Sequence, residues 1–429
     1  MHLSGLLGSE LSSPGGEPVG KVDDVIARLR GGEYPLVTGL VVKLGGRRVF
    51  VPISRVEDLS EGHVALAKSK VDLRSFERRE GEVLLRQDIL GHRLIDVADA
   101  ELIRAWDVEL QPTREGWVLS RLDTRRPARL FGLIPRSAGH PSRDWKAFEP
   151  LIGHRASVSA RAKFGRVNRL KPAQIADLLE EASRPEVEEI LDVVHDDPEL
   201  EADVFEELDP DTATRLFGDR TDLEVASVLA RMRPDDAADA VNELPQHRRE
   251  PVIELLPPGT RAKVLTLLGF NSSSAGGLMS VDVLAVPADA TVAEALRRIK
   301  LAGNLQPEAL VTVHAVDVDG RLLSTISVIE LLHADPETPL SDAGDSDPVR
   351  VSAATDVVDV ALLMADYNLL TVPVVDDTNR LLGVITVDDV LEATIPDDWR
   401  RREPPPRPEI PAAEDDTAGG TSTTSTTGT

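Results

Sequence analysis

RLLGVITVDDV, residues 380–390, repeats the pattern of RLLSTISVIEL, residues 321–331, at a constant offset of 59 positions. Each copy begins with a run of aliphatic and β-branched residues that is typical of a buried strand. A hydroxyl residue follows, Thr386 in one copy and Ser327 in the other, and either residue can cap the start of a helix. An acid stands three positions later in both copies. The repeat therefore predicts two equivalent α/β modules in the C-terminal part of the chain.

Regularly spaced prolines mark the region before this repeat. They recur about every 12 residues, at positions 172, 185, 198, 210, 234, 245 and 258, and Thr221–Asp222 fills the one gap. Proline is favoured at the first position of a helix, and acids commonly follow in the first turn. PDDAADAV, residues 234–241, shows this arrangement. One such helix cannot bury its apolar face alone, so the spacing predicts short helices stacked into a superhelix.

The N-terminal region is rich in short β-branched runs. YPLVTGLVVKL, residues 34–44, and RRVFVPI, residues 47–53, flank a Gly-Gly turn, which predicts a β-hairpin. Strand patterns at residues 19–25 and 103–108 both end in an Asp-Val step. This rhythm resembles a PRC-barrel, a small β-barrel often used for docking, and it indicates an internal duplication.

Two motifs connect the C-terminal modules with known families. VPVVD, residues 372–376, followed by LLGVITVDDVL, residues 381–391, resembles a CBS module. The helical repeat runs through SAGGLM, residues 274–279, directly into the first module. That order resembles the cytosolic part of MgtE magnesium transporters over roughly residues 170–397. A full MgtE chain continues into a transmembrane domain, whereas here Pro396 and a proline-rich segment follow, so we expect no pore in this chain.

These patterns predict a multidomain α+β fold: an N-terminal PRC-like β-barrel, an α-helical superhelix like the MgtE N-terminal domain, paired α/β CBS modules and a disordered tail. The predicted boundaries are 1–113 for the barrel, 114–171 for a basic linker, 172–277 for the superhelix, 278–335 and 336–397 for CBS modules 1 and 2, and 398–429 for the tail.

Composition narrows the class of protein. The formal net charge is −26, and residues 172–399 hold 47 acidic against 15 basic residues, a balance that repels nucleic acid and attracts cations. Cysteine is absent, which suits a reducing cytosol. No apolar run approaches the ~18 residues of a membrane-spanning helix, and no signal peptide is evident. No serine-hydrolase, P-loop, zinc-protease or dinucleotide motif is present, so the sequence predicts a protein that is not an enzyme.

Acidic side chains are the candidate metal ligands, because Mg²⁺ prefers oxygen ligands. Asp235 and Asp239 lie four positions apart, beside Asp236, and share one face of the predicted helix. The MgtE resemblance implies further ligands at the seam between the superhelix and the CBS pair. The full candidate set is Asp235, Asp236, Asp239, Asp356, Asp389, Glu392 and Asp397. Asn368 and Val358 replace acids that the resemblance implies, which weakens one or two sites. The alternative is that acids at helix starts only stabilise the helix dipole.

A second candidate site lies at the start of the last predicted helix. CBS pairs usually hold adenine nucleotides with a small-hydroxyl-x-x-acid turn, and here Gly383, Thr386 and Asp389 match it. The resemblance implies that the hydroxyl and the helix N-terminus meet phosphate while the carboxylate meets ribose. Ser327 and Glu330 hold the equivalent positions in the first module. The alternative is that Thr386 and Asp389 only cap the helix. Because Asp389 belongs to both candidate sites, metal and nucleotide binding would be coupled there.

The leading hypothesis is a soluble, cytoplasmic regulatory protein that senses divalent cations, with Mg²⁺ first, at an acidic interface between the superhelix and the CBS pair. It would act in magnesium homeostasis or on a membrane protein or transporter encoded elsewhere, with a peripheral position at the inner face of the membrane as a further option. The resemblance implies a homodimer through the CBS modules. Two alternatives stay open: an adaptor that responds to adenine nucleotides such as ATP, and a ribosome- or RNA-associated scaffold that uses the PRC-like barrel.

Overall fold

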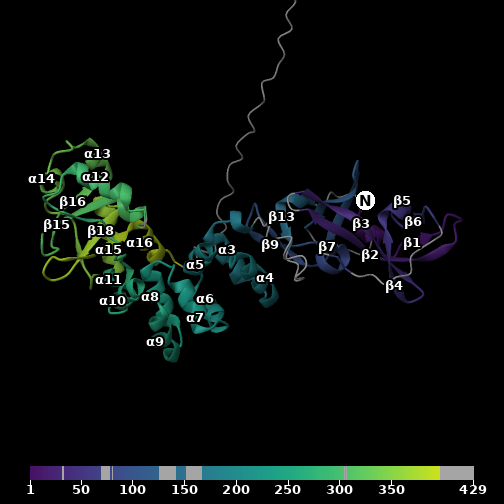
Figure 1. Ribbon diagram of the computed structural model, residues 1–429, viewed down its shortest axis with the longest axis horizontal. Helices are drawn as coiled ribbons and strands as arrows, with labels where there is room; N and C mark the ends of the chain where they lie inside the picture. The colour runs from purple at the N-terminus through teal and green to yellow at the C-terminus, as the bar shows by residue number, and fades with distance from the viewer. Residues whose placement is uncertain are drawn as a thin grey trace, which may run out of the picture. The chain divides into compact units, whose positions relative to one another are not determined.

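The computed structural model describes residues 1–30, 33–68, 78, 79, 81–124, 142–150, 167–303, 305 and 307–396. The chain divides into two compact units, which are considered separately (Figure 1). The first comprises Met1–Ser272 and Met279–Val283, and the second comprises Ser273–Leu278 and Leu284–Thr429. The tail that was predicted to be disordered, and most of the basic linker, lie outside the described residues.

The N-terminal part of the first unit is built from strands. They are β1 (Glu10–Ser12), β2 (Pro18–Arg30), β3 (Glu33–Leu44), β4 (Arg47–Pro52), β5 (Val56–Ser60), β6 (His63–Leu66), β7 (Glu82–Leu84), β8 (Arg93–Asp96), β9 (Glu101–Arg104), β10 (Asp107–Thr113), β11 (Gly116–Asp123), β12 (Ser142–Asp144) and β13 (Phe148–Pro150). Short helical segments accompany them: α1 (Leu3–Leu6), η1 (Ile53–Arg55), η2 (Leu85–Ile89), η3 (Trp145–Ala147) and η4 (Val167–Arg169).

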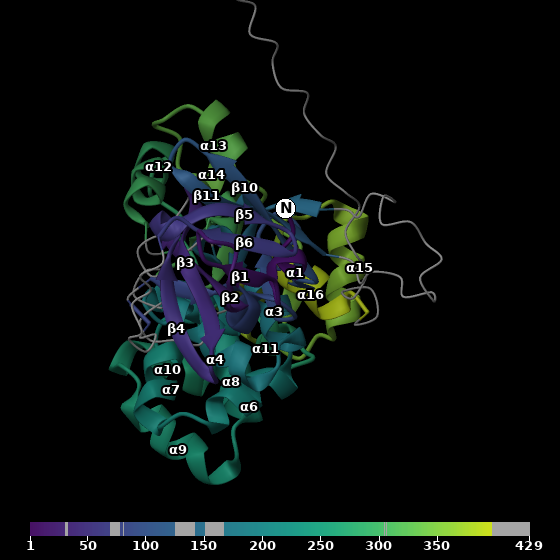
Figure 2. The same cartoon turned by 90° about the vertical axis from the view of Figure 1, so that its right-hand side faces the viewer.

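Ten of these strands form one curled sheet with the main order β10-β11-β3-β2-β1-β6-β5. Figure 2 labels these seven strands in a view turned by 90°. The predicted hairpin is β3–β4, and Gly45 and Gly46 make its turn with φ of 52° and 86°. Glycine adopts positive φ angles at no steric cost, which suits it to both positions of this turn. Strands β12 and β13, which the prediction assigned to the basic linker, pair with β11 and β8 instead. The β region therefore extends past residue 113.

The second part of the first unit is a succession of short helices. They are α3 (Pro172–Glu181), α4 (Arg184–Val194), α5 (Pro198–Glu206), α6 (Pro210–Gly218), α7 (Asp222–Leu229), α8 (Pro234–Glu243), α9 (Gln246–Leu255) and α10 (Pro258–Leu267). Every proline of the predicted series falls at the N-cap or within the first two positions of a helix. Thr221, at the gap in the series, caps α7 with its hydroxyl. The superhelix predicted from proline spacing is confirmed.

The second unit contains two three-stranded sheets with the same layout. Sheet β14-β15-β16 belongs to the first module and sheet β17-β18-β19 to the second. The elements are α11 (Ala275–Leu278), β14 (Ala285–Pro287), α12 (Val292–Leu301), η5 (Glu308–Val311), β15 (Thr312–Val316), β16 (Leu322–Ser327), α13 (Val328–His333), α14 (Leu340–Ala343), β17 (Val351–Ser352), α15 (Val357–Tyr367), β18 (Thr371–Val375), β19 (Leu381–Thr386) and α16 (Val387–Thr394).

Backbone hydrogen bonds join the two modules at equivalent turns. The amide of Leu322 donates to the carbonyl of Asn379 at 2.9 Å, and the amide of Leu381 donates to the carbonyl of Gly320 at 3.0 Å. Gly320 and Asn379 are 59 residues apart, and both have positive φ, 79° and 64°. The internal repeat of the sequence is thus matched by a pair of equivalent hydrogen bonds. These bonds hold the two modules together.

Among the described residues, no helix has both the length and the apolar character needed to cross a bilayer.

Candidate functional site

Helix α8 carries the acidic residues that were predicted as metal ligands of the superhelix. Asp235 and Asp236 stand in its first turn, and Asp239 follows one turn later. Arg233 donates from Nε to Oδ2 of Asp236 at 2.5 Å, so a guanidinium already balances that carboxylate. Asp235 is nearly buried, whereas Asp239 keeps contact with solvent. The three neighbouring carboxylates therefore have three different environments.

Asp239 carries a charge that its surroundings destabilise. Desolvation by the surrounding protein, followed by the negative charge of Glu243 one turn along the helix, raises the pKa of Asp239 to about 6. Burial likewise raises the pKa of other carboxylates of the superhelix, namely Asp177, Glu180, Asp203 and Glu206. A proton or cation near such groups stabilises the folded state. The superhelix thus holds negative charge that its own basic residues neutralise only in part.

The remaining predicted ligands lie in the second unit, on helices α15 and α16. Asp356 is the N-cap of α15, and its carboxylate accepts a hydrogen bond of 2.9 Å from a backbone amide of the first turn. Asp389 accepts hydrogen bonds of 2.9 Å from both the amide and the hydroxyl of Thr386. Glu392 follows on the next turn of α16 and is exposed. Asp397 lies outside the described residues. Asp356 and Asp389 therefore cap helices, whatever else they bind.

The predicted acids do not form a closed cage within either unit. Across the described parts of the chain, three ligand atoms of His, Asp or Glu residues come within 4.8 Å of one another at one place, formed by His2, Asp107 and Asp123. Any Mg²⁺ held by the predicted acids of one unit would keep much of its water shell, which is this ion's usual behaviour in proteins.

The predicted nucleotide-binding turns are closed by reciprocal caps. Thr386 and Asp389 form a capping box, in which the Asp389 amide also donates to the Thr386 hydroxyl at 3.3 Å. Ser327 and Glu330 form the same box at the start of α13. Gly383 is buried in β19, opposite Val374 of β18. The caps account for both hydroxyl-acid pairs locally, so a phosphate would have to share these groups or displace them.

Asn368 and Val358, the departures from the implied acidic pattern, have different settings. Asn368 ends α15 in the left-handed conformation, with φ 54° and ψ 44°, which asparagine tolerates better than most residues. Val358 lies exposed on the same helix, one turn before exposed Leu362. Helix termination thus explains Asn368, and Val358 contributes to an apolar surface.

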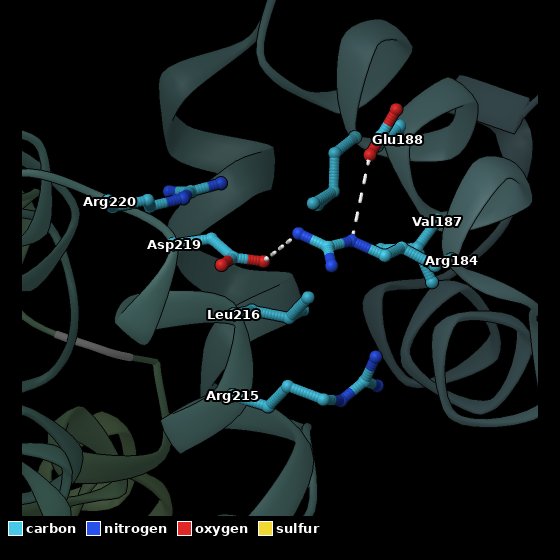
Figure 3. Close-up of a pocket in the computed structure, with 8 residues that line it drawn as sticks. Arg184, Val187, Glu188, Arg215, Leu216, Asp219 and Arg220 are labelled. Atoms are coloured by element: carbon cyan, nitrogen blue, oxygen red, sulfur yellow. Dashed lines mark hydrogen bonds and ion pairs between the residues drawn. The ribbon is translucent and has the colours of Figure 1, made fainter.

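A pocket of about 460 Å³ opens between helices α4 and α6 of the superhelix, away from the predicted ligands (Figure 3). Arg184 of α4 reaches across it to Asp219 at 3.4 Å and also lies 3.9 Å from Glu188, one turn along its own helix. Arg215 and Arg220 add two further guanidinium groups to its lining. Sequence reasoning missed this pocket, because its basic residues are scattered singly through a strongly acidic region.

His314 is a second feature that the sequence did not indicate. It lies on β15 between Val313 and Ala315, two residues of the first module's core. Its side chain is 0% exposed, and within the described part of the chain neither ring nitrogen has a hydrogen-bond partner. Burial lowers the pKa of His314 to about 4, so the ring is neutral at physiological pH. On the same strand, Thr312 accepts a hydrogen bond of 2.8 Å from Thr371 of the other module.

Residues 170–273 match the family described as the MgtE intracellular N domain, and residues 275–337 and 340–395 each match the CBS domain family. The magnesium transporter MgtE of Thermus thermophilus is 39% identical over 163 residues, which are 37% of this chain and 36% of that protein. The magnesium transporter MgtE of Enterococcus faecalis is 31% identical over 130 residues, which are 30% of this chain and 28% of that protein. The chain thus spans about a third of the length of these relatives.

One solved structure, the cytosolic domain of the Mg²⁺ channel MgtE in complex with ATP, aligns with a TM-score of 0.50 and 30% sequence identity. The alignment covers 56% of this chain and 94% of that one.

Proposed function

Because residues 170–395 belong to the MgtE N domain and CBS families, we propose that this chain is a regulatory protein, without catalytic activity, that responds to divalent cations. Mg²⁺ is the first candidate, since the curated relatives are magnesium transporters. As the sequence predicts, acids of the superhelix and acids of the CBS pair would both supply ligands for the cation. It would favour one arrangement of the two by binding that arrangement more tightly.

The environment of Asp239 is the observation that carries this proposal. Its pKa is raised to about 6 by desolvation and by Glu243, so at neutral pH the folded protein holds a carboxylate in an unfavourable setting. A hydrated divalent cation relieves this effect without needing a tight cage. Asp236 is a weaker candidate, because Arg233 already balances it.

The ligands proposed on the second unit are Asp356, Asp389, Glu392 and Asp397. Asp356 and Asp389 accept backbone hydrogen bonds at helix N-termini, where the helix dipole favours a negative charge and, by the same means, an anionic ligand for a cation.

Hydrogen exchange of the full chain tests the cation proposal. We expect excess Mg²⁺ to slow exchange in α8 relative to sodium chloride of equal ionic strength. The double variant Asp239→Asn, Glu243→Gln should lose this protection. The matched control Glu254→Gln, an exposed acid of the same superhelix, should keep it. Equal exchange in magnesium and sodium salts would overturn the proposal.

Adenine-nucleotide binding is the second candidate function. The observation in its favour is the hydroxyl-acid pair at the N-terminus of α16, repeated at α13, together with a similar structure solved in complex with ATP. Calorimetry with ATP and AMP tests it on the wild-type chain and on Asp389→Ala. Heat that disappears in the variant supports a nucleotide site at this turn. If no heat is measured for the wild type, the caps are structural only.

We propose that the chain acts in the cytosol as a homodimer that works on a membrane protein encoded elsewhere. Exposed apolar side chains on α13, α15 and α16 support a dimer through the CBS pair, because such a surface is costly to leave in water. They are Ile329, Leu332, Val358, Leu362 and Leu391. Sedimentation of the wild type and of Leu362→Glu tests this: the variant should be a monomer. A monomeric wild type would contradict the proposal.

A further inference from the structure

Three potential metal ligands from distant parts of the chain meet at one edge of the β region. His2 precedes α1, Asp107 begins β10 and Asp123 ends β11. The antiparallel register of β10 and β11 places Asp107 directly opposite Asp123. Residue 2 forms a bridge to Glu109 of β10, which brings the His2 ring over the same end of the strand pair. The ligand atoms of His2, Asp107 and Asp123 all lie within 4.8 Å of one another.

This arrangement is unfavourable without a cation. Like charges directly opposite each other on paired strands destabilise a sheet. Both carboxylates are also largely withdrawn from solvent, with side-chain exposures of 17% for Asp107 and 12% for Asp123. Nδ1 of His2 lies 3.9 Å from Oδ2 of Asp107 and 3.8 Å from Oδ2 of Asp123, too far for a hydrogen bond to either. That nitrogen is buried and has no hydrogen-bond partner among the described residues.

The spacing fits a metal ion between the three atoms. A cation equidistant from them would lie roughly 2.2–2.5 Å from each, against about 2.0–2.2 Å for histidine and carboxylate ligands of zinc, so a small inward movement closes the site. One imidazole nitrogen with two carboxylate oxygens suits Zn²⁺ and similar transition-metal ions, whereas Mg²⁺ prefers oxygen ligands alone.

Surrounding hydrogen bonds hold the ligands in position. Oδ1 of Asp107 accepts from the amides of Ser4 at 3.1 Å and Val108 at 2.8 Å, and its Oδ2 accepts from the Ser4 hydroxyl. The amide of His2 donates to Glu61 at 2.9 Å. Such second-layer contacts orient metal ligands and fix their geometry.

We propose that His2, Asp107 and Asp123 bind one divalent transition-metal ion of the zinc class. The ion neutralises the facing carboxylates and fastens the first residues of the chain to β10 and β11. Three protein ligands leave at least one coordination position open. The side chain of His2 is 46% exposed although its Nδ1 is buried, so the candidate site lies near the surface of the β region. This site shares no residue with the acids of α8. The zinc-class proposal and the cation-sensing proposal are therefore tested independently.

Competition of the full chain with a fluorescent zinc chelator tests the site, after removal of any polyhistidine tag. We expect one Zn²⁺ per chain, and at least tenfold weaker binding in His2→Gln and in Asp123→Asn. His247→Gln, which changes an exposed histidine of the superhelix, should bind as the wild type does. Because the chain has no cysteine, thiolate sites cannot mask the result. Unchanged affinity in both ligand variants, or equal loss in the control, would overturn the assignment.

Spectroscopy of the wild-type protein tests the same site without variants, so its result does not depend on whether a variant folds. In the wild type, stoichiometric Zn²⁺ should shift the ring resonances of His2 before those of the other histidines. Co²⁺ should give visible absorption bands that a chelator removes. If the His2 resonances do not move, the ring only lies beside the two carboxylates, and the metal site does not exist.

Discussion

The superhelix and the CBS pair respond to protons in opposite directions. In the superhelix, Asp239 is forced to hold a charge that its surroundings disfavour, and its pKa rises to about 6. In the CBS pair, His314 is kept uncharged in a sealed core, and its pKa falls to about 4. Protonation of Asp239 therefore stabilises the folded superhelix, whereas protonation of His314 destabilises the folded CBS pair.

The difference comes from architecture. Helices α4 to α8 of the superhelix each carry acids in the first turn, so carboxylates accumulate at these helix starts. The central strands of the CBS sheets are buried along most of their length, including all five residues of β18, and charge is excluded from such cores. The following experiments test the contrast, from the largest expected effect to the smallest.

Replacing His314 should have the largest effect on pH dependence. The folded state holds fewer protons than the unfolded state between pH 6.5 and about 4, so the stability of the second unit falls as pH falls through this window. The full effect is about 3 kcal/mol. His314→Leu, of similar volume, should remove it, as measured by hydrogen exchange in β15 and β18 at pH 7 and pH 4.5. If the variant loses protection at acid pH as the wild type does, His314 is not the responsible group.

Removing a cap should cost less. Thr386→Ala leaves the first amides of α16 without their hydroxyl acceptor, for a loss of about 1 kcal/mol. Ser327→Ala, the equivalent change in the first module, is the matched comparison and should cost a similar amount. Thermal unfolding measures both, and repeating it with ATP separates the two roles of Thr386. A nucleotide that stabilises Ser327→Ala but not Thr386→Ala locates the ligand at α16.

Neutralising Asp239 should stabilise the superhelix. Its folded state holds more protons than the unfolded state between about pH 4 and pH 6, so its stability falls as pH rises through that window. After allowance for solvent screening of an exposed side chain, Asp239→Asn should gain below about 1 kcal/mol at pH 7. Hydrogen exchange in α8 should then be flat across this window. A loss of protection in the variant would show that Asp239 makes a favourable contact as an anion.

The smallest effect is expected from Glu243→Gln. It removes one like-charge neighbour at i,i+4, worth about 0.2–0.5 kcal/mol. Carboxyl resonances of the superhelix should then show Asp239 titrating at lower pH. An unmoved titration would mean that desolvation alone sets the pKa of Asp239.

The sequence predicted the parts of this fold that repeat. Proline spacing located the helices of the superhelix, and the 59-residue offset located both CBS modules, because each signal is local and recurs. Strands β12 and β13 were missed, since their pairing with β11 and β8 depends on distant segments.

The candidate sites were less predictable than the fold. Acid positions can be read from the sequence, but the pairing of Asp236 with Arg233 and the desolvation of Asp239 appear only after packing. The convergence of His2 with Asp107 and Asp123 crosses more than 100 residues and has no motif. Buried His314 gave no signal either, because nothing local distinguishes it from a surface histidine.

The paired turns at Gly320 and Asn379 have a consequence for how the CBS pair can be divided. Each module donates one backbone hydrogen bond to the other, so a module on its own leaves these backbone groups without their partners. Polypeptides severed between α13 and α14 should therefore reassemble when mixed, as halves of a split reporter do. When each half is expressed alone, we expect it to form a homodimer, because a second copy of the same half replaces the missing module.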